Sequence, residues 1–206
     1  MKLNNANESN PVSEQKKRQM RKDIANLFGE ILETLGIDTK SDPNSKDTPR
    51  RVAKMYVDEI FAGRFDAPPK ITVFPNTKHV DQLIVTGPLT VKSLCSHHMM
   101  PIVGQAWIGY LPKDNLLGLS KFPRVLDWFC RRPQIQEELT QQTADYLNDL
   151  LQPSGLAVFI KAQHFCQSHR GVNESADSVM QTQVLLGSLR EVASLKAEFL
   201  SLVNSK

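Results

Sequence analysis

Long hydrophobic runs are missing from this sequence. Its longest purely apolar stretches span only a few residues, as at positions 156–160, and residues 1–11 contain no apolar segment of the kind found in secretory signals. Cysteine is scarce as well: three residues are too few, and an odd number, for a disulfide framework. We therefore expect a cytoplasmic protein that does not span a membrane and whose thiols are free to bind metal.

A large excess of charge of one sign is also absent. The formal net charge is +3, and basic residues alternate with acidic ones except in a cluster at residues 16–22. Because no RNA- or DNA-binding motif accompanies this cluster, we interpret it as a solvated helix face and expect no nucleic-acid partner. The ten glycines form neither a GxGxxG nor a Walker A pattern. Any bound nucleotide must then be held mainly by side chains.

Apolar spacing predicts several amphipathic helices. Residues 13–36 carry apolar side chains at intervals of three and four, with Gly36 as a plausible end. Thr48 followed by Pro49 is typical of an N-cap and a first helical residue, so a second helix is expected to about residue 61. Further helical patterns occupy residues 122–129, 135–151 and 192–203.

Between these helices lie runs rich in β-branched and aromatic residues. Five such runs predict strands, of which the first three are expected to be neighbours in an antiparallel arrangement. They occupy residues 70–74, 82–92, 102–111, 156–166 and 178–186. Strands in pairs flanked by helices, without regular βαβ alternation, indicate an α+β fold with a mainly antiparallel sheet.

The expected domain organisation follows from these patterns. Residues 1–12 are rich in Asn and Ser and are predicted to form a disordered tail. Residues 13–62 form an N-terminal helical region, and residues 63–206 form the main domain, which ends in a C-terminal helix.

Soft and borderline metal ligands gather in two short stretches of the sequence. Cys95 and His98 have a C-x-x-H spacing that lets both side chains reach one ion, with His97 beside them. Residues two apart on a strand share a face, so His164 and Cys166 can both face one site. Thiolate and imidazole favour zinc, and a set of three ligands leaves a position for water, as in catalytic zinc sites.

The remaining candidates for metal binding are weaker. Unrelated core cysteines and histidines with ordinary partners remain the alternative interpretation of the whole group. Cys130 continues an apolar helical pattern and His79 lies in a polar turn, so both are expected to be structural or incidental. His169 is left undecided.

Four motifs stand out in the sequence: Cys-Ser-His-His at residues 95–98, Gly-Leu-Ser-Lys at 118–121, Arg-Pro-Gln-Ile-Gln-Glu at 132–137, and His-Phe-Cys at 164–166 followed by Arg170-Gly171. Taken together, these motifs resemble the GTP cyclohydrolase I family. The resemblance extends from about Thr48 to Leu202. It implies that Cys95, His98 and Cys166 bind zinc.

The resemblance also implies roles for other residues. His97 and His164 would act as acids and bases, and Gln136 and Glu137 would recognise guanine. The implied triphosphate ligands are Ser120, Lys121, Arg124 and Arg170, together with Arg51 and Lys54 acting on a neighbouring subunit's substrate. The implied reaction opens the imidazole ring of GTP with a zinc-activated water, releases formate and forms 7,8-dihydroneopterin triphosphate.

The fold implied by the resemblance is the tunnelling fold (T-fold), an antiparallel sheet with two helices on one face, here preceded by an N-terminal helical extension. The implied assembly is a homodecamer of two pentamers with sites at subunit interfaces. Ser96 replaces the family's usual Glu, and Ser168 and His169 also depart from its pattern. A non-catalytic zinc-binding relative, or a T-fold enzyme acting on a pterin or deazapurine, is the alternative.

Overall fold

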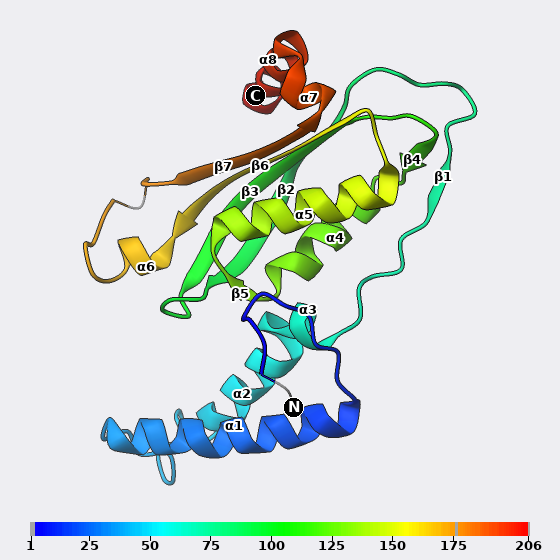
Figure 1. Ribbon diagram of the computed structural model, residues 1–206. Coiled ribbons are helices and arrows are strands. Elements are labelled where there is room, and N and C mark those ends of the chain that lie inside the picture. Colours follow the sequence, from blue (N-terminus) through cyan, green and yellow to red (C-terminus); the bar gives the residue numbers. More distant parts are fainter. Residues whose placement is uncertain (1–2, 176, 206) are drawn as a thin grey trace. The chain divides into compact units, whose positions relative to one another are not determined.

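The computed structural model describes residues 3–175 and 177–205, and it divides into two compact units after Ala67. Sequence patterns put this boundary slightly earlier, after residue 62. None of the helices in the described ranges combines the length and the apolar character that a membrane span requires. Figure 1 gives the labels of the elements.

Helices make up the first unit. Helix α1 (Glu14–Thr34) begins after Ser13, whose side-chain oxygen accepts a hydrogen bond from the backbone N–H of Lys16 at 3.2 Å. This cap confirms the helix predicted from apolar spacing. The second predicted helix starts at Thr48, its expected N-cap, so the N-cap position falls one residue earlier, at Asp47. The helix also changes character along its length. It comprises α2 (Thr48–Met55), the π-helical turn η1 (Tyr56–Ile60) and α3 (Ala62–Phe65).

The stretch before α1, for which we predicted disorder, contains no helix or strand within residues 3–12. It nevertheless makes defined hydrogen bonds. The backbone N–H groups of Asn10 and Val12 donate to the carbonyls of Arg64 and Phe65 at 2.6 and 3.0 Å. The guanidinium of Arg64 donates to the carbonyl of Ala6 at 2.8 Å. These bonds connect the stretch to α3.

A five-stranded sheet forms the second unit, in the order β5-β2-β3-β6-β7. All its pairings are antiparallel except that between β2 and β5, which is parallel and short. The strands are β2 (Ile84–Cys95), β3 (Pro101–Leu111), β5 (Pro133–Gln134), β6 (Gly155–His164) and β7 (Met180–Gly187). With its helices, this sheet confirms the mixed α+β class.

One strand prediction needs correction. Residues 70–74 were expected beside the other strands, but the observed strand β1 (Val73–Pro75) pairs with β4 (Asn115–Leu117) in a separate two-stranded sheet. Proline residues at positions 68, 69 and 75 flank this run and remove backbone donors, which limits the strand to three residues.

Two helices cover one face of the main sheet, as Figure 1 shows: α4 (Lys121–Cys130) and α5 (Gln136–Leu151). Val158 and Ile160 of β6 belong to the same buried cluster as residues of these helices. The alternate residues Ala157 and Phe159 point the other way and pack in a second cluster. This alternation is the two-residue period of a strand buried on both faces.

The C-terminal helix α8 (Ala193–Asn204) follows the short helix α7 (Ser188–Glu191), and both contribute to the second cluster. Phe199 of α8 is fully buried there. Its ring lies directly over Gly109 of β3, where an added Cβ would be 2.7 Å from a ring carbon. The close approach of α8 to the sheet therefore depends on the missing side chain at position 109.

Candidate active site

Strand register brings together two stretches that are distant in sequence. Leu94 of β2 pairs with Pro101 of β3, and Ile102 of β3 pairs with His164 of β6. Because both pairings are antiparallel, the C-terminal ends of β2 and β6 lie on either side of the beginning of β3. Cys95 is the last residue of β2, and Cys166 follows the end of β6.

The three predicted metal ligands meet at this end of the sheet. Each of Cys95, His98 and Cys166 offers one ligand atom, and these atoms lie within 4.8 Å of one another. Cys95 is buried, Cys166 is half-buried and His98 is exposed, so the group lies at the surface with one wall in the core. Two thiols and an imidazole this close together suit zinc, which prefers sulfur and nitrogen ligands.

The expected location of Cys166 on a strand was wrong. We expected His164 and Cys166 on one face of a strand, but β6 ends at His164 and the chain turns into the short helix α6 (Phe165–Ser168). Cys166 reaches the group from this helix. Burial, together with the neighbouring Cys95 thiol, raises the pKa of the Cys166 thiol. A bound cation would instead lower the pKa of this thiol, because it stabilises the thiolate.

The two histidines proposed as acid and base differ in their surroundings. His97 is exposed in the turn after β2, and its ring stands edge-on to that of His98 with the centroids 6.5 Å apart. His164 is half-buried, and its Nε2 lies 2.8 Å from Oε1 of Gln136. Desolvation lowers the pKa of His164, while the negative charge of Glu137 acts to raise it. His164 is thus the more firmly positioned of the two.

Gln136 and Glu137, the predicted guanine ligands, face different surroundings although both lie in the first turn of α5. Gln136 is fully buried, and its amide nitrogen lies near the carbonyls of Ile160 and Met180 and the hydroxyl of Thr182. Glu137 is exposed. Only Glu137 presents its side chain to solvent, close enough to His164 for its charge to act there.

The predicted phosphate ligands of the second unit lie in two places. Ser120 precedes α4, and Lys121 and Arg124 belong to its first turn. Within residues 3–175 and 177–205, no hydrogen bond or ion pair joins these three side chains to the metal group. Arg170, in contrast, places Nη1 3.1 Å from Nε2 of His98. A guanidinium therefore lies beside the candidate metal ligands.

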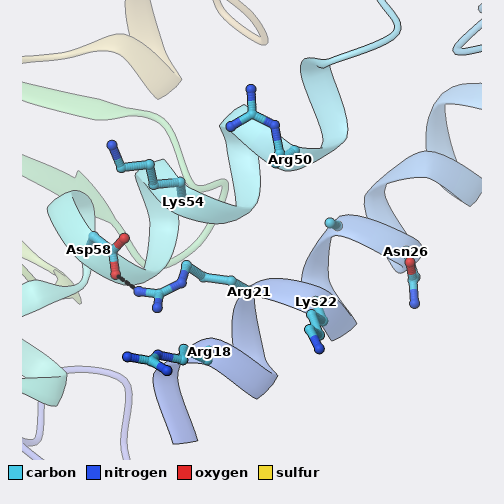
Figure 2. A pocket seen from close by; sticks show the side chains of 8 residues that line it. Arg18, Arg21, Lys22, Asn26, Arg50, Lys54 and Asp58 are labelled. Carbon is cyan, nitrogen blue, oxygen red and sulfur yellow. Dashed lines mark hydrogen bonds and ion pairs between the residues drawn. The ribbon is translucent and has the colours of Figure 1, made fainter. Parts of the chain in front are cut away.

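Arg51 and Lys54 belong to the first unit. Lys54 lines a pocket of about 770 Å³ between α1 and the α2–η1 segment, and Figure 2 shows Arg21 extending across it towards Asp58. Nη1 of Arg21 lies 2.5 Å from Oδ1 of Asp58. The pocket is lined by Arg18, Arg21, Lys22, Ala25, Asn26, Arg50, Lys54 and Asp58. Part of the basic cluster that we interpreted as a solvated helix face thus lines this pocket, whereas Arg51 does not.

The remaining cysteine and histidines stay outside the metal group. Cys130 is buried in α4, and desolvation raises its pKa to about 12, as expected of a core thiol. His79 lies exposed in a turn with a φ of 53°. The ring of His169 lies 4.8 Å from that of Phe165.

Sequence reasoning missed Thr140 and Thr182, whose hydroxyls are 2.7 Å apart next to Gln136. The available signal for Thr140 was its position one helical turn after Gln136. Nothing in the sequence pattern pointed to Thr182.

The fold and the site define a mixed α+β protein with a candidate metal centre of two cysteines and one histidine at one end of its main sheet. Residues 24–204 match the GTP cyclohydrolase I family, and the chain belongs to this family. The matched range includes every candidate site residue named above.

Curated relatives agree with this assignment. GTP cyclohydrolase 1 of Enterobacter sp. (strain 638) is 42% identical over 194 residues, which cover 94% of this chain and 86% of that protein. GTP cyclohydrolase 1 of Citrobacter koseri is 41% identical with the same coverage. Among solved structures, the apo form of the archaeosine synthase QueF-Like aligns with a TM-score of 0.41 and 15% identity, over 52% of this chain and 94% of that one. That likeness is too weak to define the fold.

We expect about one zinc ion per chain, and we expect Cys95→Ala and Cys166→Ala to lose most of it, because each variant removes a ligand atom from the group. Cys130→Ala is the matched control, since it also removes a buried thiol but one outside the group. Metal analysis of the purified variants measures the difference, with circular dichroism to verify folding. Full zinc content in folded Cys166→Ala would refute the three-ligand assignment.

Proposed function

We propose that this chain is a zinc-dependent GTP cyclohydrolase. It would open the imidazole ring of GTP by hydrolysis, release formate and form 7,8-dihydroneopterin triphosphate. The observation that supports this proposal best is the convergence of Cys95, His98 and Cys166 at one end of the sheet, beside His164, in a member of the GTP cyclohydrolase I family. Such a group of ligands and a nearby proton carrier are what ring hydrolysis requires.

Zinc held by these three residues would act as a Lewis acid and make water nucleophilic near neutral pH. The chain itself must move protons. Addition of water at C8 of guanine is helped by a proton delivered to N7, and the later opening of the ribose and closure of the new ring need further transfers. His164, held by Gln136, and the exposed His97 can give and take these protons.

Substrate binding is assigned to charged side chains, of which Glu137 and Arg170 lie near this centre. The exposed carboxylate of Glu137 can accept hydrogen bonds from both N1–H and the 2-amino group of guanine. The triphosphate is assigned to Lys121, Arg124 and Arg170, with the hydroxyl of Ser120. Arginine suits this role because its planar guanidinium can bind two phosphate oxygens at once.

A homodecamer of two pentamers is part of the proposal, with Arg51 and Lys54 acting on the phosphates of a neighbouring subunit's substrate. The second unit offers an edge suited to assembly, because β7 ends the sheet order and leaves one side of its backbone without a partner strand in the described chain.

The alternative is a catalytically inactive or altered-substrate zinc-binding relative. Ser96 favours it, because this residue replaces the carboxylate that the family usually has next to the first metal ligand. An activity assay with GTP decides between the two.

Purified protein incubated with GTP should release formate and yield a pterin that fluoresces after oxidation, in equal amounts. His164→Ala should retain zinc but lose about 10²–10⁴-fold in turnover, the usual contribution of a positioned acid or base. His79→Ala serves as control, because it removes an imidazole from an exposed turn. Absence of formate from the zinc-loaded wild-type protein would leave the inactive relative as the better description.

Base selection tests Glu137. Inosine triphosphate keeps N1–H but lacks the 2-amino donor. Its binding in the transition state should therefore be about 1.5–3 kcal/mol weaker than that of GTP, the contribution of one charge-assisted hydrogen bond. ATP presents an acceptor at N1 and should not be turned over. Glu137→Ala should reduce kcat/KM for GTP far more than for inosine triphosphate. Glu138→Ala, the neighbouring exposed carboxylate, is the control. An unchanged preference for GTP in Glu137→Ala would exclude contact with the 2-amino group.

Assembly can be measured directly. Light scattering at micromolar protein should give a multiple of the 23.2 kDa chain mass, with ten chains expected. A monomer mass together with full GTP turnover would mean that Arg51 and Lys54 do not act across an interface.

A further inference from the structure

The side chain of Gln136 joins the beginning of α5 to the edge of the sheet next to His164. Its Nε2 lies 3.2 Å from the carbonyl oxygens of both Ile160 and Met180, one on β6 and the other on β7, and 3.0 Å from the hydroxyl of Thr182. Its Oε1 lies 2.8 Å from Nε2 of His164. The residue has no exposed surface, so these contacts determine how the amide is oriented.

Only one orientation of this amide is chemically reasonable. The two backbone carbonyls can accept hydrogen bonds but cannot donate them, so the group that faces them must be the NH₂ end. The reversed amide would put an oxygen against two carbonyl oxygens in a buried place, where neither carbonyl can donate to it. The amide oxygen must therefore face His164.

This orientation determines where His164 carries its hydrogen. An amide oxygen accepts only, so Nε2 of His164 must be the donor in the 2.8 Å contact. In the neutral ring the other nitrogen, Nδ1, then has a lone pair. Nδ1 has no hydrogen-bond partner within the part of the chain that the structure describes.

Two threonines hold the amide in this orientation. The hydroxyl of Thr140 donates to the backbone carbonyl of Gln136 at 2.7 Å, so it must accept from the hydroxyl of Thr182, which is also 2.7 Å away. The hydroxyl of Thr182 in turn accepts from the amide of Gln136. All three bonds run in one direction, from the amide through Thr182 and Thr140 to the carbonyl of the same residue.

We propose that Gln136 is a positioning residue that fixes the Nε2–H tautomer and the ring plane of His164, so that Nδ1 is the nitrogen presented to the substrate. Thr140 and Thr182 support Gln136 in this role. Its relevance to turnover rests on the proposed function, but the tautomer itself does not. Guanine recognition by a side chain of this pair is then left to Glu137.

The protein offers a matched pair of variants for a test. Thr140 and Thr143 lie on the same helix, are both buried, and both donate to the carbonyl four residues earlier, at 2.7 and 2.8 Å. Only Thr140 belongs to the chain of bonds that reaches Gln136. Thr140→Val and Thr143→Val remove the same hydroxyl from the same helix, but only Thr140→Val also takes the acceptor away from the hydroxyl of Thr182.

Thr140→Val should lower kcat for GTP by about 2–10-fold, the rate equivalent of one hydrogen bond, with KM changed by less than about twofold. Thr143→Val should keep the wild-type kcat. Adding Thr182→Val to Thr140→Val should lower kcat little further, because both threonines act through one chain of hydrogen bonds. Equal losses of kcat in Thr140→Val and Thr143→Val would overturn the proposal.

A second measurement separates this inference from the proposed function. Solid-state NMR of the full chain with ¹⁵N-labelled histidine, assigned with His164→Gln, reports which ring nitrogen carries hydrogen. The expected result is a protonated Nε2 and an unprotonated Nδ1 in neutral His164, with a mixture of tautomers in Thr140→Val. A protonated Nδ1 in the wild-type protein would overturn the inference. If GTP is not turned over but Nε2 carries the hydrogen, the proposed function fails and the positioning role stands.

Discussion

The pairing of β6 with β3 on one side and β7 on the other is the constraint on which the rest of the site depends. It fixes His164 opposite Ile102, and thus at the same end of the sheet as Cys95. It also sets the carbonyls of Ile160 and Met180 next to each other, where one amide can reach both. A shift of β6 by one residue would turn His164 to the opposite face and separate these carbonyls.

Two consecutive residues at the beginning of α5 have different surroundings next to these paired strands. Successive residues on a helix point about 100° apart, so Gln136 can face the sheet while Glu137 faces solvent. The first residue is fixed by the strands and the second remains accessible to a ligand. A single helical turn thereby connects the interior of the sheet with the surface near His164.

Much of this arrangement could be predicted from the sequence, since it depends on local patterns. Apolar spacing located the long helices, and the C-x-x-H spacing with the later Cys166 gave the group that the structure brings together. The position of Cys166 in α6 could not be predicted, because strand propensity continues past His164 and does not indicate where the chain turns. The burial of Gln136 could not be predicted from the sequence either. Its partners lie on β6 and β7, and a polar residue in a first helical turn is ordinarily exposed.

Because the ring of Phe199 packs directly on Gly109, the residues at these two positions, far apart in the chain, depend on each other. A methyl group at position 109 would collide with the ring, and a smaller residue at position 199 would leave a cavity over the strand. These two positions should therefore vary together during evolution. A chimera that receives the C-terminal helix of a relative should fold well only if the residue at position 109 of β3 is exchanged with it.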